Sequence, residues 1–449
     1  MSDQDLHLLL SVSAAMFVIL AAAQIFGRLA PWVGQPVVFG EMAAGVALGP
    51  SLFGALAPDV SSELFTSEVR PILFFIAMTG LSLYMFVVGV EHKEPAHKSG
   101  HTSMPFVMAT AGIAAPVVIG AVAATLVAGD LRPDNIDGTL FAVFVGGALS
   151  VTAFPMLARI LQQRGMMHTP FGMIATRTAA IDDAFAWCLL AVVGASVGGG
   201  PLEGLVRTIL PASAFTLAVF CVLPMLFRKP MQAAVREGRI GEGLFGALIL
   251  LVLGAGWFTD YIGIYSVFGG FIVGMALPRV QGFSSLLSTS VLPTVRSLML
   301  PVFFAFSGLN TDITQLSGHL IPVTLVILVA AFVSKTASSV VVMRAYRCDW
   351  RSSAAMGALM NARGLMILIF INIGLGLGVI EQRMYSILVV VALVTTALAL
   401  PLYRRMYSAA REDEGRAAAA AEAVQAAAGG ARTSSRTKAT AGDSITPPR

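Results

Sequence analysis

Apolar residues along this chain fall into long runs separated by short polar segments. A helix needs roughly 17 to 25 mostly apolar residues to cross the hydrocarbon core of a bilayer, so these runs predict about 13 membrane-spanning helices. They lie near 6–30, 36–56, 71–91, 105–129, 139–163, 171–195, 206–227, 243–259, 262–278, 289–309, 319–345, 352–378 and 384–407. The pattern predicts an all-α polytopic membrane protein, with a transmembrane domain over 1–407 and a disordered cytoplasmic tail over 408–449.

The composition supports a membrane protein. Of the 449 residues, 56% are hydrophobic and 12% are charged, and the mean hydropathy is +0.81. A soluble domain has about 25% charged residues. The three cysteines have no metal-binding spacing, and no nucleotide-binding fingerprint follows the apolar part. We therefore expect no cofactor, no nucleic-acid partner and no enzymatic activity.

The positive charges give the topology. The loops after every second predicted helix hold most of the Lys and Arg residues, among them Lys93, Lys98, Arg164, Arg228 and Lys229. Lys and Arg accumulate in cytoplasmic loops. The sequence thus predicts a multi-pass plasma-membrane protein with its N-terminus outside and its C-terminus in the cytoplasm.

The order of the predicted helices suggests an internal repeat. If the seventh helix, 206–227, is a connector, helices 1–6 and 8–13 form two halves that enter the membrane from opposite sides, which is the layout of an inverted-repeat transporter. Corresponding helices in the two halves carry glycines and polar residues at mid-depth, at 146–155 and at 357–364. Broken helices lining a site are one interpretation. Close helix packing, as expected of 45–49, is the other.

Two adjacent carboxylates, Asp182 and Asp183, lie near the middle of the predicted helix over 171–195. An ionisable residue at that depth costs about 2.5 to 3.5 kcal/mol on insertion scales, and such residues mark ion pathways or partners. Consecutive side chains on a helix diverge by about 100°, so each aspartate addresses a different neighbour. We expect one of them to face an ion cavity.

Lys335, near the middle of the predicted helix over 319–345, supplies a partner of opposite charge. We predict an ion pair between Lys335 and Asp182, which leaves Asp183 for the ion, although helix geometry alone does not fix which aspartate is paired. A static strut between Lys335 and one aspartate is the alternative, and it leaves the second carboxylate unexplained.

The oxygen atoms near this pair suit a monovalent cation. Ser150, Thr152 and carbonyls of a broken helix would surround a carboxylate that binds either a cation or a proton. Such competition produces exchange if only the occupied forms cross between two access states. Supporting residues are predicted at Asn361 and Arg363 beside the second break, at Arg177 about a turn and a half before Asp182, and at Glu41. Arg363 would neutralise the negative end of a half-helix.

Several of these motifs together resemble a known family. They are Gln35 to Glu41, Leu48 to Ser51, Leu149 to Leu161, Asp182 to Trp187, Lys335 and Asn361 to Leu365. In these segments the chain resembles the second superfamily of monovalent cation:proton antiporters, which includes sodium/proton and potassium/proton exchangers and the plant cation/proton exchangers. The resemblance covers about residues 6–407.

The resemblance implies a homodimer with a dimerisation domain and a six-helix core, in which the fifth and twelfth helices cross where they unwind. It implies an elevator-like, electrogenic exchange of Na⁺ or K⁺ for protons. Asp183 resembles the ion-binding aspartate, Asp182 the aspartate paired to the lysine, and Thr152 with Ser150 the ligands at the crossing. Ile367 stands where many relatives have a glutamate, so no second acidic group is expected there.

Two other functions compete with an antiporter. An intramembrane aspartyl protease needs two aspartates converging from separate helices, whereas Asp182 and Asp183 are adjacent on one helix. A cation-coupled symporter of organic solutes on the same inverted-repeat scaffold is the stronger alternative.

Overall fold

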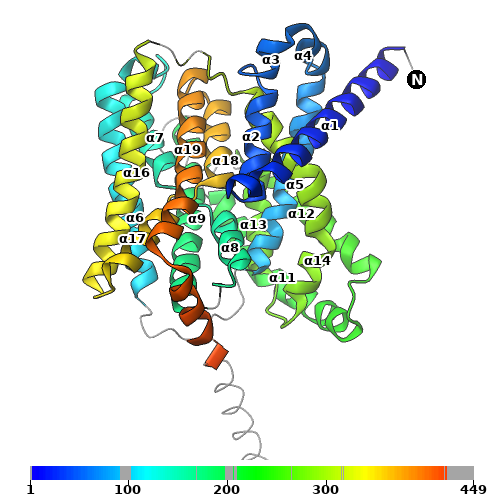
Figure 1. The fold of residues 1–449 in the computed structure, drawn as a ribbon. Helices are drawn as coiled ribbons and strands as arrows, with labels where there is room; N and C mark the ends of the chain where they lie inside the picture. The colour runs from blue at the N-terminus through cyan, green and yellow to red at the C-terminus, as the bar shows by residue number, and fades with distance from the viewer. Residues whose placement is uncertain are drawn as a thin grey trace, which may run out of the picture.

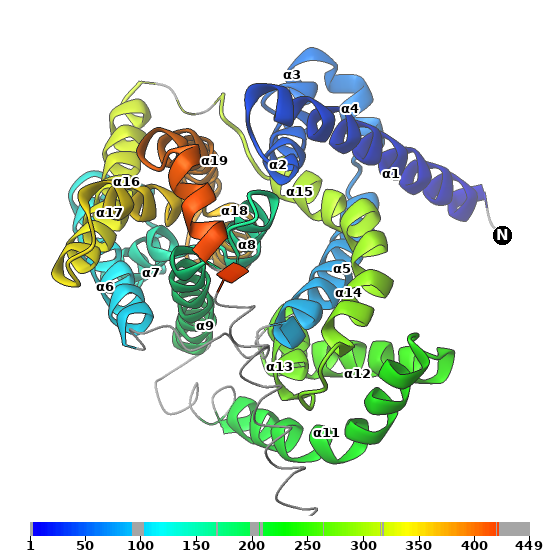
Figure 2. The ribbon, with the colours of Figure 1, turned by 60° about the horizontal axis from the view of Figure 1, so that its bottom comes forward.

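The computed structural model describes residues 3–91, 103–167, 169–197, 206, 210–263, 265–314, 316, 318–418 and 420–421. Throughout these ranges the regular structure is helical and no strand occurs. The helices form two bundles side by side, which Figures 1 and 2 show from two directions. Most contacts between helices stay within one bundle. The chain thus folds as two helical bodies with a limited interface.

The first body, here called the core bundle, contains the segments with the predicted site. Its helices are α6 (Met104–Val127), α7 (Gly138–Ser150), α8 (Phe154–Gln163), α9 (Pro170–Val197), α16 (Leu320–Ala345), α17 (Trp350–Leu359), α18 (Gly364–Gly376) and α19 (Gln382–Met406). It occupies the left side of Figure 2, where α6, α16 and α17 lie on its outer flank.

The second body, the scaffold bundle, curves around one side of the core bundle in Figure 2. Its elements are α1 (Asp3–Leu29), η1 (Ala30–Val33), α2 (Val37–Leu48), α3 (Phe53–Leu56), α4 (Pro58–Leu64), α5 (Val69–Glu91), α11 (Leu210–Glu237), α12 (Glu242–Tyr261), α13 (Ser266–Ala276), α14 (Phe283–Thr294), η4 (Val295–Met299) and α15 (Leu300–Leu309). The turn η4 is a π-helix that joins α14 and α15 into one bent run.

Each predicted membrane segment coincides with a helix or with a helix interrupted by a break. By length and apolarity alone, nine helices among the described residues suffice to cross a membrane, or ten if α17 and α18 form one bent span. The remaining predicted segments fall short for local reasons. Two of their helices, α7 and α13, are shorter apolar helices, and the segment over 171–195 corresponds to the 28-residue helix α9. The predicted all-α membrane fold is confirmed, and its count of 13 is approximate.

Two helices are interrupted at the same depth in the core bundle. Between α7 and α8, Val151 and Ala153 have extended backbone conformations, and Pro155 in the first turn of α8 fits there because that turn needs no N–H donor from it. Between α17 and α18 the direction changes by 43°. The two breaks cross, and the Ala153 N–H donates to the Ala362 carbonyl at 3.1 Å. The broken-helix interpretation of both segments is thus confirmed.

A glycine makes the second break possible. Gly364, the first residue of α18, has a φ of +48°, which disfavours any residue with a Cβ. A Cβ there would also lie 3.0 Å from the Cβ of Met156 on α8. The glycine in the motif over 361–365 therefore allows both the turn and the close approach of the crossing helices.

The predicted tail begins too early at 408. Residues 409–418 are helical and dock against the core bundle. Arg164, after α8, forms a bidentate ion pair with Glu412 at 2.6 and 2.9 Å, and Glu412 is only 3% exposed. The buried ion pair between Glu412 and Arg164 holds this segment in place. The alanine-rich composition of the segment gives no sign of this contact. Residues 422–449 lie outside the described ranges.

A second ion pair holds the same segment at the start of α17. Asp349 caps that helix by accepting the Ser352 N–H, and Arg411 donates to the same carboxylate at 2.5 Å. Burial raises the pKa of Asp349, but the hydrogen bonds from Ser352 and Arg411 outweigh burial and lower this pKa to about 2. The cap and the ion pair therefore persist across the physiological pH range.

Within the scaffold bundle, α2 and α15 cross in backbone contact. A Cβ added to Gly308 would lie 1.8 Å from the Gly45 carbonyl oxygen, and a Cβ added to Gly49 would lie 2.1 Å from the Gly308 carbonyl oxygen. Small residues allow helices in membranes to approach this closely. The prediction that the glycines over 45–49 serve packing is confirmed.

Gly308→Ala should therefore separate α2 from α15 and lower the free energy of unfolding by about 1 to 3 kcal/mol or more. Thermal unfolding in detergent, followed by tryptophan fluorescence, measures the effect. Gly246→Ala on α12 is the matched control, because a Cβ there meets no atom within 4 Å. An equal melting temperature for the wild type and Gly308→Ala would contradict the close crossing.

Candidate functional site

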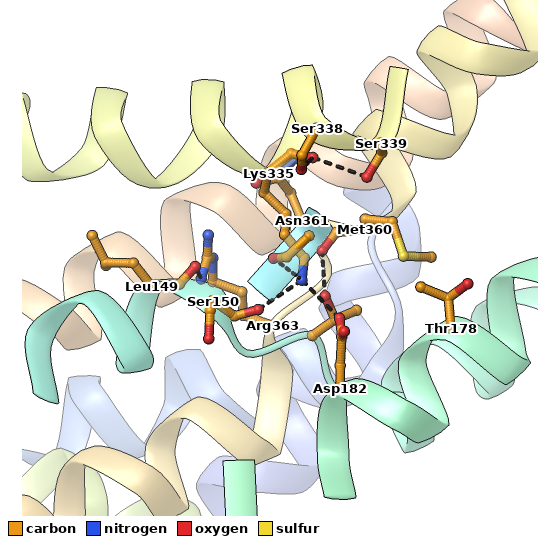
Figure 3. A network of polar contacts seen from close by, with 12 residues as sticks. Leu149, Ser150, Thr178, Asp182, Lys335, Ser338, Ser339, Met360, Asn361 and Arg363 are labelled. Atoms are coloured by element: carbon orange, nitrogen blue, oxygen red, sulfur yellow. Dashed lines mark hydrogen bonds and ion pairs between the residues drawn. The ribbon is translucent and has the colours of Figure 1, made fainter. Parts of the chain in front are cut away.

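The predicted ion pair is present at the crossing. Lys335 Nζ lies 2.7 Å from Asp182 Oδ2, and both side chains are almost fully buried. The same ammonium donates to the carbonyls of Gly112 on α6 at 2.9 Å and of Ser150 on α7 at 2.7 Å. Figure 3 shows Lys335 reaching from α16 toward Asp182 on α9. An ammonium has three donors, so this environment satisfies all of them.

Sequence reasoning missed Gly112, although a signal for it exists. In a helix the carbonyl of residue 112 would accept the N–H of residue 116, but that residue is a proline and has no N–H. The Gly112 carbonyl is consequently available to Lys335. A Cβ at Gly112 would approach Lys335 Nζ to 3.4 Å, so the glycine also leaves room for the ammonium. A proline within a predicted membrane helix, here Pro116, therefore indicates a carbonyl one turn earlier that is free to accept another donor.

Two cations neutralise the end of α7. The last carbonyls of a helix carry partial negative charge. Arg363 is fully buried and donates to the Leu149 carbonyl, to the Ala148 carbonyl at 3.4 Å and to the Ala331 carbonyl at 3.0 Å. Lys335 binds the adjoining Ser150 carbonyl. Arg363 is thus placed at the carbonyl end of a half-helix, and that half-helix is α7.

The polar side chains at the crossing are held by the backbone. Thr152 Oγ1 donates to the Met360 carbonyl at 2.9 Å and lies beside the Asp182 carboxylate. Ser150 Oγ donates to the Gly147 carbonyl of its own helix at 2.7 Å, so its carbonyl rather than its hydroxyl faces Lys335. Asn361 donates to Thr336 and to the Gly357 carbonyl, both at 2.9 Å.

Asp183 differs from these neighbours. It is fully buried, and the N–H of Phe154, the first residue of α8, faces its carboxylate. Neither carboxylate oxygen has a hydrogen-bond partner of normal geometry among the described residues. Asp182 Oδ1 and Asn361 Oδ1 also have no hydrogen-bond partner of normal geometry among the described residues. A buried acceptor without a donor is costly. Hard monovalent cations and protons are species that such oxygen atoms bind.

Glu41 and Arg177 are the two other predicted supporting residues. Glu41 is half-buried on α2 of the scaffold bundle, where it lines a cavity of about 460 Å³ together with Arg28 and Arg296. Arg177 is half-buried on α9, five residues before Asp182. The structure brings Asp182, Lys335, Thr152, Ser150, Asn361 and Arg363 together at the crossing, and Asp183 lies next to them on α9.

The chain is similar to characterised transporters over most of its length. It is 35% identical over 407 residues to the Na⁺/H⁺ antiporter NhaS4 of Synechocystis, a match that covers 90% of this chain and 99% of that protein. It is 33% identical over 411 residues to cation/H⁺ antiporter 18 of Arabidopsis thaliana, covering 91% of this chain and 50% of that protein. The chain thus spans nearly all of one relative and about half of the other.

A solved structure and a family model agree with this likeness. The sodium proton antiporter MjNhaP1 from Methanocaldococcus jannaschii has a similar fold, with a TM-score of 0.57 at 14% identity over 91% of this chain and 99% of that chain. The family model described as sodium/hydrogen exchanger, transmembrane, matches residues 15–403. The chain therefore belongs to the sodium/hydrogen exchanger family of transmembrane transporters.

Proposed function

We propose that this protein is an antiporter that exchanges Na⁺ or K⁺ for protons across the plasma membrane. The observation that carries the proposal is Asp183, a fully buried carboxylate whose two oxygens lack hydrogen-bond partners of normal geometry among the described residues. An isolated charge at that depth is costly, so it needs a neutralising ion. A proton and an alkali cation both neutralise it, and they exclude each other.

Exchange follows from this competition if only a neutralised Asp183 crosses between the two sides. Protonated and cation-bound forms then move, and the empty carboxylate stays. Each crossing in one direction with a cation must be followed by a return with a proton. The neighbouring oxygens of Asp182 and Asn361 add ligands for the cation at the crossing.

Lys335 gives the exchange a second proton. The ammonium is held by Asp182 and two carbonyls, so a cation arriving beside Asp182 weakens the attraction that keeps the ammonium protonated. We infer that Lys335 releases its proton when the cation binds. Two protons would then exchange for one cation, and the cycle would carry net charge across the membrane.

The two bundles supply the moving parts in this proposal. The core bundle would slide as one elevator-like body against the scaffold bundle, which we infer also forms the homodimer contact implied by the family resemblance. The limited contact between the bundles supports such a movement. Two inverted repeats joined by α11 as the connector, an outside N-terminus and a cytoplasmic C-terminus complete the proposal. The interruptions in the fifth and twelfth predicted helices support the repeat.

Asp183→Asn should abolish exchange while the protein stays folded, because the amide neither carries charge nor releases a proton. Everted vesicles with a pH dye measure dissipation of a proton gradient after Na⁺, K⁺ or Li⁺ is added without any organic solute. Glu242→Gln, at an exposed position on α12, is the control and should behave as the wild type. Dissipation at the wild-type rate by Asp183→Asn would remove the site assignment, and a requirement for an organic solute would favour a symporter.

Lys335→Met keeps the volume of the side chain but leaves Asp182 without its ion-pair partner. It should lower the free energy of unfolding by about 3 to 5 kcal/mol, the cost of unpairing a buried charge. Adding Asp182→Asn should recover part of that loss. In proteoliposomes with an imposed potential, exchange by Lys335→Met should lose its voltage dependence. Unchanged voltage dependence would rule out the two-proton scheme.

A further inference from the structure

Arg296 is an intramembrane charge outside the site already described. It lies midway along the apolar run Phe283–Leu309, on the π-helical turn η4 that joins α14 to α15. π-Helical turns are rare and occur often at functional positions. An arginine at this depth usually faces a water-filled cavity or a partner. Arg296 is half-buried, and its guanidinium lies 6.0 Å from the ring centre of Tyr84 on α5.

The guanidinium borders a cavity between the two bundles. This cavity has a volume of about 200 Å³. The scaffold bundle lines it with Tyr84, Glu91, Ser288 and Arg296, and α8 of the core bundle lines it with Phe154 and Gln162. Phe154 connects the cavity to the site, because its N–H faces the Asp183 carboxylate. Phe154 therefore belongs both to the cavity lining and to the surroundings of the Asp183 carboxylate.

The two charged residues of the cavity lining, Glu91 and Arg296, lie at different depths in the membrane-spanning part of the protein. Glu91, the last residue of α5, accepts a hydrogen bond from Ser288 at 2.6 Å. Arg296 follows Ser288 by eight residues along the same helical run, which corresponds to about 12 Å. Among the described lining residues, an acidic group therefore stands near the end of α5 and a basic group stands deeper. On its other side Arg296 borders the cavity that holds Arg28 and Glu41.

The charge of Arg296 acts differently on two states of the core bundle. In the occupied carrier, Asp183 holds a proton or a cation, and in the empty carrier the Asp183 carboxylate is bare. A fixed positive charge attracts a bare carboxylate that approaches it, and it exerts little force on a carboxylate neutralised by a proton or a cation. An exchanger needs this distinction, because return of the empty carrier would dissipate the gradient without exchange. The interaction acts on the core bundle from the scaffold bundle, across the interface along which the proposed movement occurs.

We propose that Arg296 is the scaffold charge that retains the empty carrier, and so couples the movement of cations to the movement of protons. The inference rests on the proposed antiport function. Arg296 is a positioning residue: it binds neither cation nor proton, and it acts on the Asp183 carboxylate when Asp183 is unoccupied. Its effect depends on the charge at position 296 and not on the shape of the side chain.

Arg296→Gln should raise uncoupled cation flux by roughly five- to tenfold, because the empty carrier is no longer retained. Purified protein in proteoliposomes with ²²Na⁺ or ⁸⁶Rb⁺ and an internal pH dye gives the number of protons moved per cation. That ratio should fall in Arg296→Gln and in Arg296→Met, and Arg296→Lys should restore it. Arg28→Gln is the matched control, since Arg28 borders the second cavity and is not among the lining residues of the first.

A ratio that stays at the wild-type value in Arg296→Gln and Arg296→Met, whatever happens to the KM or the maximal rate, would overturn the role of Arg296. The same would follow if Arg296→Lys failed to restore a lowered ratio in a folded protein. Failure of the antiport function itself has a different result, because the wild type would then move no protons in response to cations. Thermal unfolding of each variant confirms that the comparison is made between folded proteins.

Discussion

The structure depends on how charge is neutralised inside an apolar bundle. At the crossing of the broken helices, Lys335 satisfies its three donors with Asp182 and two carbonyls, and Arg363 donates to carbonyls at the end of α7 and on α16. Charges left without partners at this depth would destabilise the fold. These contacts make a frame beside which neither oxygen of the Asp183 carboxylate has a hydrogen-bond partner of normal geometry among the described residues.

The break between α7 and α8 places partial negative charge, from the carbonyls that end α7, next to partial positive charge, from the N–H groups that begin α8. The α7 terminus exposes carbonyls, which bind Lys335 and Arg363, and the first N–H of α8 faces Asp183. Helix termini carry such partial charges without the desolvation cost of additional ionised side chains. The break between α7 and α8 therefore positions the cationic frame and the free carboxylate relative to each other.

Much of this arrangement could be predicted from the sequence. Apolar runs located the helices, glycine and polar residues located both breaks, and charge balance paired Lys335 with one of the two adjacent aspartates, because these are strong local signals. Contacts made by the backbone were not predicted. The role of the Gly112 carbonyl depends on the missing N–H of Pro116 and on the three-dimensional approach of α6 to α16.

Charges whose partners are distant in sequence were also missed. Arg296 lies in a segment read as one apolar helix, and its position at a cavity depends on how the two bundles meet. The docking of 409–418 depends on Glu412 meeting Arg164 across 248 positions of sequence, in a stretch whose composition suggests disorder. Local periodicity reports which face of a helix is apolar, but it does not report which distant charge that face will meet.

The central claim is that a proton and a cation compete for one carboxylate, Asp183. The most direct test is the apparent KM for Na⁺ or K⁺ in proteoliposomes across a series of pH values, with equal pH on both sides. Competition predicts that, in the acidic range, KM rises about tenfold for each unit decrease in pH per competing proton, while the maximal rate stays constant. A KM that is independent of pH, together with a maximal rate that falls with acidification, would contradict the account.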